Sequence, residues 1–392
     1  MKITSVETRV LKIPMPGDPM SGTGGLHGTA AELSGLAQAE YQLVPPFRSA
    51  YPKRVHGLLV NLRTDSGLVG LGECQAPVAP EAPQAIIQHL LGPMLIGQDP
   101  LAREPLWERM YSSMRERGHT TGFMLDAISA VDIALWDLAG KAAGQPIHQL
   151  LGGAFRTQAP VYVSGLPGAS REARVAAATE FVARGFKAIK LFLGHGLAED
   201  VAEVEAVRAA VGGDVRLMVD VQWLYDVPGA IKLGRALERN DVYWLETPIS
   251  PEDTAGHAEL CATLDVAIAL GECERTRFQF LPLLERRAVD IAQPDVGRAG
   301  GITESRKIAA LAETFNVPCA LHLGVGLAAY IAASVQLAAS IPNLSYVEYQ
   351  PAMLRLANSL LQEPLVCEAG YIRIPQGPGL GIAWNEEALA AL

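Results

Sequence analysis

The spacing of apolar residues along the chain changes near Pro160. Beyond it, short apolar runs alternate with stretches of about 12 to 15 residues whose apolar positions recur as in amphipathic helices. Eight strands are expected, at Val161–Ser164, Ala188–Phe192, Arg216–Val221, Val242–Glu246, Ala267–Gly271, Val289–Gln293, Val317–His322 and Leu344–Tyr349. Eight strand and helix units in about 190 residues favour an α/β fold of the (β/α) TIM-type barrel class, and a doubly wound sheet is the second choice.

The first part of the chain has a different, mixed pattern. Residues Lys2 to Ile13 alternate as in a strand, and Gly57–Thr64 and Val69–Glu73 flank a turn sequence as in a hairpin. From Thr121 to Gly144 the apolar residues recur at helical spacing, so this helix is expected to join two domains. The sequence therefore predicts an N-terminal α+β capping domain beside the barrel.

These patterns divide the chain into a capping domain (1–125), a barrel (126–355) and a C-terminal segment (356–392). The run from Gly17 to Ser49 is too long for an ordinary connection, and we interpret it as a lid. After Pro351 the chain contains clusters of proline and glycine, so irregular structure is expected. This tail is predicted to pack back on the first domain.

Composition narrows the class of protein. The formal net charge is −10 and charged residues make up 19% of the chain, so no basic surface for nucleic acid or anionic lipid is expected. No apolar stretch approaches the roughly 20 residues of a membrane span. Five cysteines without CxxC spacing argue against disulfides and structural zinc. Without signal-peptide features, a cytoplasmic protein is expected. A homo-oligomer, between dimer and octamer, is also expected.

Ionisable residues stand at or just beyond the C-terminal ends of seven predicted strands. They are 23 to 30 residues apart, at Lys190, Asp220, Glu246, Glu272, Asp295, His322 and Glu348. One strand and helix unit of a barrel takes roughly 30 residues, and barrel active sites lie at the C-terminal rim. The regular spacing therefore predicts that all seven side chains meet at one rim.

Three successive members of this set, Asp220, Glu246 and Glu272, are carboxylates. Hard oxygen donors without a sulfur partner favour Mg²⁺ over zinc. A single carboxylate at a strand end often only caps the next helix, but three on neighbouring strands favour a metal site. A bound cation would also allow an acidic enzyme to bind an anionic substrate.

His322 and Asp295 end adjacent predicted strands. A carboxylate beside an imidazole fixes its tautomer and stabilises the imidazolium, which suits a general base. A lone histidine in an apolar strand is more often a core residue, but Asp295 and the metal cluster favour the base. Glu348 is expected either to be kept neutral by its neighbours and donate to an oxyanion, or to be a plain rim carboxylate.

Motifs around these residues resemble the enolase superfamily, in its mandelate racemase branch. The resemblance covers nearly the whole chain and implies that Asp220, Glu246 and Glu272 hold Mg²⁺, which binds a substrate carboxylate in bidentate fashion. It implies a dyad role for His322 and Asp295 and an electrophilic role for Glu348. The motifs are Asp220-Val-Gln222, Leu245-Glu246-Thr-Pro248, Gly271-Glu272, Gln293-Pro294-Asp295, His322 and Glu348, with Asp132-Ile-Ala-Leu-Trp136-Asp137-Leu and Leu150-Leu151-Gly152-Gly153 at the domain junction.

The chain departs from that family's pattern at three places. The family often carries Lys-x-Lys on the second barrel strand, where the second Lys is the base on the opposite face; here Phe192 takes that position after Lys190. Asp-x-Asn and Glu-Glu-Pro become Asp220-Val-Gln222 and Glu246-Thr247-Pro248, which keep the ligand positions. Racemisation through two opposed bases needs one on each face of the α-carbon, so the loss of the second Lys favours a one-sided reaction.

These features predict an enzyme in which Mg²⁺ and Lys190 bind a substrate carboxylate while His322 removes the α-proton, giving an enediolate. The resemblance implies acid sugars such as aldonates and aldarates as the substrate class. Loss of water to an α-keto acid is the preferred outcome, with protonated His322 or Glu348 as the acid. The alternative within the family is a racemase, epimerase or lactone cycloisomerase. Other classes are a Schiff-base lyase with Lys190 as nucleophile and a metal-binding protein without turnover.

Substrate choice is expected to depend on the loop of the first domain, where His27, Arg48, Tyr51 and Lys53 are candidates, together with Gln222 on the barrel. Each of the four loop residues is more often an ordinary surface residue. At least one contact among them is expected.

Overall fold

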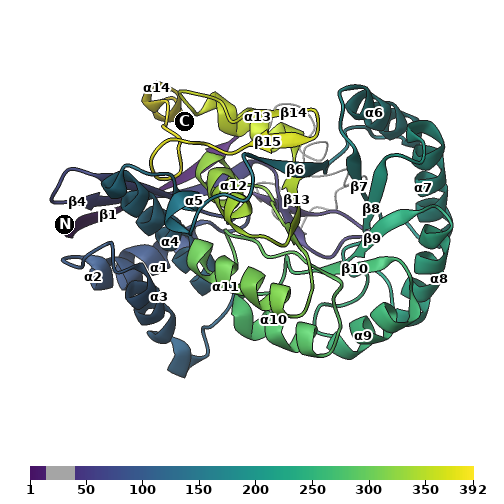
Figure 1. Ribbon diagram of the computed structural model, residues 1–392, viewed down its shortest axis with the longest axis horizontal. Helices are drawn as coiled ribbons and strands as arrows, with labels where there is room; N and C mark the ends of the chain where they lie inside the picture. The colour runs from purple at the N-terminus through teal and green to yellow at the C-terminus, as the bar shows by residue number, and fades with distance from the viewer. Residues whose placement is uncertain (15–39) are drawn as a thin grey trace.

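The computed structural model describes residues 1–14 and 40–392, and most of the chain forms a closed barrel (Figure 1). Eight parallel strands are hydrogen-bonded in sequence order, and β13 pairs with β6 to close the sheet. The predicted barrel is confirmed, although β11 and β12 are shorter than expected. The strands are β6 (Gln158–Val163), β7 (Ala188–Phe192), β8 (Arg216–Asp220), β9 (Val242–Glu246), β10 (Ala267–Leu270), β11 (Ile291–Ala292), β12 (Cys319–Leu321) and β13 (Leu344–Tyr349).

Helices follow each of the first seven strands and form the outer ring of the barrel (Figure 1). Local capping explains where some of them begin: Asp226 accepts from the backbone N–H of Gly229 and Asp253 from that of Gly256, both at 2.8 Å. The helices are α6 (Arg171–Ala183), α7 (Leu197–Val211), α8 (Val227–Glu238), α9 (Thr254–Thr263), α10 (Thr276–Glu285), α11 (Gly301–Thr314) and α12 (Ala328–Ser340). In the part of the chain that the structure describes, no helix is long and apolar enough to cross a membrane.

A layer of buried side chains fills the barrel interior. Each of the first seven strands contributes one member, and Tyr346 of β13 packs against the layer. Since side chains two apart share a face of a strand, residues two positions after each member also point inward, one layer nearer the C-terminal rim. The seven members are Tyr162, Ala188, Met218, Trp244, Ala269, Ile291 and Ala320.

The N-terminal unit is an antiparallel sheet covered by helices. Its strands are β1 (Ile3–Ile13), β4 (Val55–Thr64) and β5 (Val69–Cys74), with a separate ribbon of β2 (Tyr41–Leu43) and β3 (Ala50–Pro52). The helical segments are α1 (Glu81–Ile86), η1 (Ile87–Leu91), α2 (Gly92–Leu95), α3 (Arg103–Ser112), η2 (Arg115–Arg117), α4 (Phe123–Ala143) and α5 (Ile147–Leu150).

Helix α4 takes part in two hydrophobic cores. Most of its buried residues pack with the N-terminal sheet, whereas Ile133 and Trp136 belong to the core of the barrel. The helix thus lies between the two units, and the expected domain boundary near residue 125 stays a prediction. Most of the predicted lid, with His27, lies outside the described residues.

The C-terminal segment is more regular than its sequence suggested. It forms α13 (Pro351–Ser359), β14 (Cys367–Glu368), β15 (Tyr371–Arg373) and α14 (Glu386–Ala390), so the expectation of irregular structure is wrong for these stretches and is confirmed for the Pro- and Gly-rich run at 375–379. Pro351 stands in the first turn of α13, where its missing N–H costs nothing, and so it begins a helix instead of breaking one.

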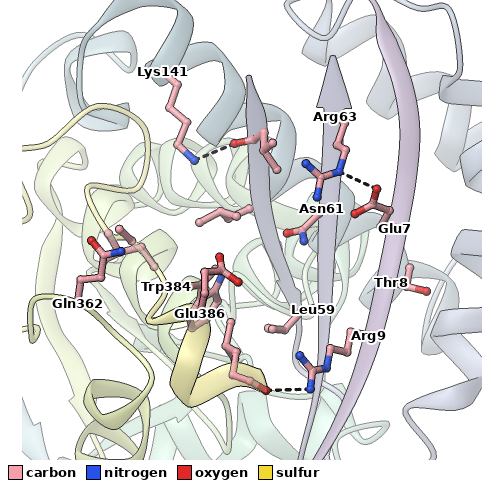
Figure 2. A pocket seen from close by; sticks show the side chains of 15 residues that line it. Glu7, Thr8, Arg9, Leu59, Asn61, Arg63, Lys141, Gln362, Trp384 and Glu386 are labelled. Atoms are coloured by element: carbon pink, nitrogen blue, oxygen red, sulfur yellow. Dashed lines mark hydrogen bonds and ion pairs between the residues drawn. The ribbon is translucent and has the colours of Figure 1, made fainter. Parts of the chain in front are cut away.

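This segment contacts the N-terminal sheet. Arg9 donates to the carbonyl of Leu389 at 2.8 Å, and a cavity of about 570 Å³ lies beside this contact, between the sheet and the segment (Figure 2). Its walls include the ion pair between Arg63 and Glu7 and the ring of Trp384. None of the predicted site residues lines this cavity.

Two carboxylates of the N-terminal unit accept from backbone N–H groups in the first turns of barrel helices. Asp132 on α4 accepts from the N–H of Thr303 at 2.9 Å and from its hydroxyl at 2.5 Å, in the first turn of α11. Glu73 on β5 accepts from the N–H groups of Leu327 and Tyr330, where α12 begins. These carboxylates satisfy backbone donors that have no partner within the helix. Helices α11 and α12 follow β11 and β12, which precede Asp295 and His322.

Asp132 makes stability depend on pH. Burial raises its pKa to about 7 even though Thr303 donates to it, so between about pH 4 and 7 the folded chain holds a proton that the unfolded chain has lost. Stability from this group is therefore lost as pH rises through that window. In Asp132→Asn this loss is absent, and the unfolding free energy of the variant relative to wild type should rise with pH by about 4 kcal/mol at most. Urea unfolding across that range measures it; a pH-independent difference would contradict it.

Candidate active site

The predicted rim residues surround a cavity of about 310 Å³ at the C-terminal ends of the barrel strands. Five of the seven line it, together with residues 49–52, 75, 77 and 78 of the N-terminal unit; the five are Lys190, Asp220, Glu272, His322 and Glu348. Glu246 and Asp295 are fully buried directly behind them. The larger cavity beside the C-terminal segment has no comparable set of acid, base and cation side chains.

The inward layer of the barrel explains why these side chains meet. Residues two positions beyond the apolar layer are polar on most strands, and they are Ser164, Lys190, Asp220, Glu246, Gln293, His322 and Glu348. On β10 that position is Gly271, whose φ of +146° turns the chain, and Glu272 follows it. The same rule identifies Ser164 and Gln293, which sequence reasoning missed.

Lys190 is buried among three carboxylates. Its Nζ lies 2.7 Å from Glu246 Oε1, 3.1 Å from Glu348 Oε1 and 3.6 Å from Asp220 Oδ2. Burial alone would lower its pKa, but Glu246 and Glu348 raise it well above the ordinary value. Lys190 is therefore a fixed cation in this arrangement, with no free lone pair for nucleophilic attack or proton removal.

Glu246 is held by neighbours beyond Lys190. Its Oε2 accepts from Gln293 Nε2 at 2.7 Å and from Trp244 Nε1 at 3.1 Å. Asp220 accepts from the backbone N–H of Gln222 at 3.0 Å and lies 3.6 Å from Lys190 Nζ. Burial and the nearby charges of Glu246 and Glu272 raise its pKa well above the usual range, and Lys190 offsets this only in part.

The fit of the three predicted ligands to a divalent metal depends on how closely their carboxyl groups are gathered. Among residues 1–14 and 40–392, no group of three or more His, Cys, Asp or Glu side chains is gathered closely enough to hold a metal ion as it stands. Glu272 instead faces His322 Nε2 at 3.4 Å and Arg298 at 4.0 Å. Convergence of Asp220, Glu246 and Glu272 on one cation therefore stays a prediction.

The charge balance of the cavity nevertheless fits such an ion. Five carboxyl groups face at most three cations, so at least two of them have no cationic partner, and the raised pKa of Asp220 follows from burial and from this excess of acidic groups. All prospective ligands are hard oxygen donors, as Mg²⁺ prefers. The carboxylates are Asp220, Glu246, Glu272, Asp295 and Glu348, and the cations are Lys190, Arg298 and, when protonated, His322.

His322 and Asp295 form the expected pair. Nδ1 of His322 lies 2.6 Å from Asp295 Oδ2, and Nε2 is directed toward Glu272 and Glu348, which line the cavity. Burial raises the pKa of Asp295, but the hydrogen bond and charge of His322 outweigh it and hold that pKa below its usual range. An ionised Asp295 can only accept, so Nδ1 carries the proton and Nε2 is left as the base.

Glu348 differs from its expected state. Burial would raise its pKa, but Lys190 and His322 lower it to about 2, and the N–H of Leu323 also donates to it at 3.1 Å. The expectation that neighbours keep Glu348 neutral is wrong for this arrangement, because Lys190 beside it is cationic. As an ion it holds Lys190 and has no proton to donate.

The predicted substrate-binding residues divide into two groups. Tyr51 and Gln222 line the cavity, and the hydroxyl of Tyr51 donates to Gln222 Oε1 at 2.7 Å. Arg48 is exposed and lines a neighbouring cavity, and Lys53 lines neither. The structure therefore brings neither Arg48 nor Lys53 to this cavity.

Phe192 lines the cavity as expected from its position two residues after Lys190. Its ring lies 4.7 Å from that of Phe47, centroid to centroid, so this wall is apolar. Arg298 is a further wall residue that sequence reasoning missed; its Nε donates to Gln75 at 2.7 Å. Arg298 stands three residues after Asp295, at the same rim, and this position in the sequence could have indicated that it belongs to the site.

Comparison with known families and proteins agrees with this geometry. Residues 36–152 match the family described as "Mandelate racemase / muconate lactonizing enzyme, N-terminal domain", and residues 173–388 match "Enolase C-terminal domain-like". These matches cover both the N-terminal unit and most of the barrel.

Individual relatives extend over most of the chain. D-galactarolactone cycloisomerase of Agrobacterium fabrum is 38% identical over 365 residues, which is 89% of this chain and 95% of that one. D-xylonate dehydratase of Haloferax volcanii is 35% identical over 356 residues, 85% and 84% of the two chains. A solved structure described as a racemase from Streptomyces coelicolor with bound magnesium has a TM-score of 0.85 and 30% identity, covering 100% of this chain and 99% of that one.

Proposed function

The chain belongs to the mandelate racemase / muconate lactonizing enzyme family of the enolase superfamily and is an enzyme of the lyase or isomerase type, and from this premise we propose that it removes the α-proton of an acid-sugar carboxylate with Mg²⁺ bound. The observation that carries the proposal is the cavity itself, where an oriented imidazole faces carboxyl groups that outnumber the cations. Homo-oligomer formation stays a prediction.

His322 is the base in this mechanism. Because Asp295 holds the Nδ1 proton, Nε2 has a free lone pair directed into the cavity. Lys190 is not assigned as the base, because its ammonium group also lies 3.1 Å from Glu348, a carboxylate outside the proposed ligand set. It is instead placed to attract and orient the substrate carboxylate.

Asp220, Glu246 and Glu272 are the residues that would hold Mg²⁺. When bound, the ion supplies positive charge that binds the substrate carboxylate and stabilises the enediolate. Gln293 and Trp244 orient Glu246 from behind, as outer partners of ligands commonly do.

We propose that the enediolate then expels a β-hydroxyl. The carboxylate re-forms, the electron pair of its double bond to the α-carbon moves to form the Cα=Cβ bond, and the β C–O bond breaks. The oxygen leaves as water, taking the proton that His322 acquired. Glu348 is ionised, so His322 is the acid for this step. The resulting enol becomes an α-keto acid.

A cycloisomerase is the second candidate, favoured by the 38% identity to D-galactarolactone cycloisomerase. It requires the same base, but the β-oxygen belongs to a ring and stays in the product. Racemisation is less favoured, because the apolar Phe192 occupies the position of an opposed base. Both candidates act on acid sugars or their lactones, as the names of the relatives indicate.

A library of aldonates, aldarates and their lactones, incubated with enzyme and Mg²⁺ in D₂O, tests the proposal. The expected result is an α-keto acid from at least one open-chain acid. Its formation is measured by ¹H NMR and by the absorbance of its semicarbazone. A keto acid formed only from lactones would establish the cycloisomerase. Deuterated epimers without keto acid would overturn both.

Phe192→Lys tests the one-sided site. The new ammonium would offer a proton on the second face of the enediolate, so the variant should form a stereoisomer that wild type does not. Phe192→Leu is the matched control, because it keeps an apolar wall without a base. Chiral chromatography of recovered substrate measures the change; identical stereochemistry in both variants would contradict it.

A further inference from the structure

Tyr330, a buried residue in the first turn of α12, contacts the base pair of the site. Its hydroxyl lies 2.6 Å from Asp295 Oδ2, the same oxygen that His322 Nδ1 contacts at 2.6 Å. Asp295 Oδ1 accepts from the N–H of Gly297 at 2.7 Å. Three donors therefore hold one carboxylate, which cannot rotate without breaking at least one of these bonds.

The direction of the Tyr330 hydrogen bond is fixed by its other partner. The backbone N–H of Gly324 lies 3.0 Å from the phenol oxygen and can only donate, so the oxygen accepts there. The single hydroxyl proton is then free for Asp295. Oδ2 of Asp295 accepts from the phenol and carries no proton of its own. The hydrogen bond between Oδ2 and His322 must therefore use a proton on His322 Nδ1.

Two glycines allow the phenol ring to reach this position. A Cβ at Gly297 would come within 2.7 Å of Gln75 and 2.9 Å of the Tyr330 ring. At Gly326 a Cβ would lie 2.2 Å from the same ring. The loops after β11 and β12 are thus shaped around Tyr330.

The N-terminal unit fixes the helix that carries the ring. Glu73 on β5 accepts from the N–H of Tyr330 at 3.0 Å and from that of Leu327. Both carboxylate oxygens of this fully buried side chain bind the first turn of α12. A series of hydrogen bonds therefore connects Glu73 of the N-terminal unit, through Tyr330, to Asp295 and His322.

We propose that Tyr330, held by Glu73 of the N-terminal unit, is a positioning residue that orients Asp295 and so keeps His322 Nε2 aimed at the substrate. This rests on the proposed function, in which His322 is the base. Tyr330 does not touch the substrate, since it does not line the cavity. Its effect should therefore appear in the rate of proton removal and not in substrate binding.

The test compares Tyr330→Phe with Tyr225→Phe in the metal-loaded enzyme. Tyr225 also donates to an aspartate, Asp200, but neither residue lines the cavity, so the control removes the same kind of bond elsewhere. Tyr330→Phe should lower kcat for α-proton exchange by about tenfold, the lower end of what losing an outer hydrogen-bond partner costs at a metal site, with KM unchanged. Tyr225→Phe should leave both constants as in wild type.

An activity-independent readout separates this proposal from the proposed function. The Nδ1 proton of His322 gives a downfield ¹H NMR resonance, assigned by its absence in His322→Asn, and Tyr330→Phe should shift it while Tyr225→Phe does not. Unchanged kcat with an unmoved resonance would overturn the positioning role, and so would an equal loss of kcat in both variants. If no carboxylate exchanges even with wild type, the proposed function fails, and the resonance alone decides the role of Tyr330.

Discussion

His322→Asn is expected to abolish exchange of the substrate α-proton with solvent deuterium, lowering its rate by about 10³-fold. The amide keeps a group of similar size next to Asp295 but has no basic lone pair in the position of Nε2. We expect no other side chain to replace it, because Lys190 is held as a cation by Glu348. Loss of the α-proton signal by ¹H NMR in D₂O measures the rate.

The matched control is His257→Asn. His257 is also buried, and its Nδ1 contacts the carbonyl of Asp253 at 2.9 Å, but it lies on α9 away from the cavity. This variant should exchange the α-proton as wild type does. Near wild-type exchange in His322→Asn would show that another group is the base and would remove the central step of the mechanism.

Glu246→Gln is expected to weaken binding of Mg²⁺, or of Mn²⁺ as its probe, by about 100-fold or more, because loss of an outer partner alone costs 10 to 100-fold. The amide offers one neutral oxygen in place of a charged carboxylate, and its NH₂ group would face Lys190 or Gln293. Gln293→Ala, which removes only the 2.7 Å bond to Glu246, should weaken binding by about tenfold.

Calorimetric titration of metal into the enzyme without substrate measures this affinity. Glu180→Gln, a change on the surface of α6, is the control and should bind as wild type does. Equal affinity in Glu246→Gln and wild type would show that the metal binds elsewhere. Loss of activity with unchanged metal affinity would place Glu246 outside the ligand set while leaving the role of His322 intact.

The barrel and its rim could be predicted from sequence because they follow local periodicities. Apolar runs of strand length alternate with helical patterns, and all eight strands were found within a few residues of their predicted positions. Since side chains on a strand alternate between two faces, Lys190, Asp220, Glu246, His322 and Glu348 all point inward at one level. Helix α13 was missed in the tail, although Pro351 occupies a helical first turn.

Which rim residues pair with one another was decided only by the tertiary structure. The sequence by itself determined the residue types, their strands and their common rim, because these depend on spacing along the chain. The ion pairs of Lys190, the ionised state of Glu348 and the hydrogen bond of Tyr330 to Asp295 depend on contacts between residues 25 to 158 positions apart, as well as on glycines that permit close approach. Such contacts have no period in the sequence, and burial makes each charge respond to whichever neighbours the fold brings within a few ångströms.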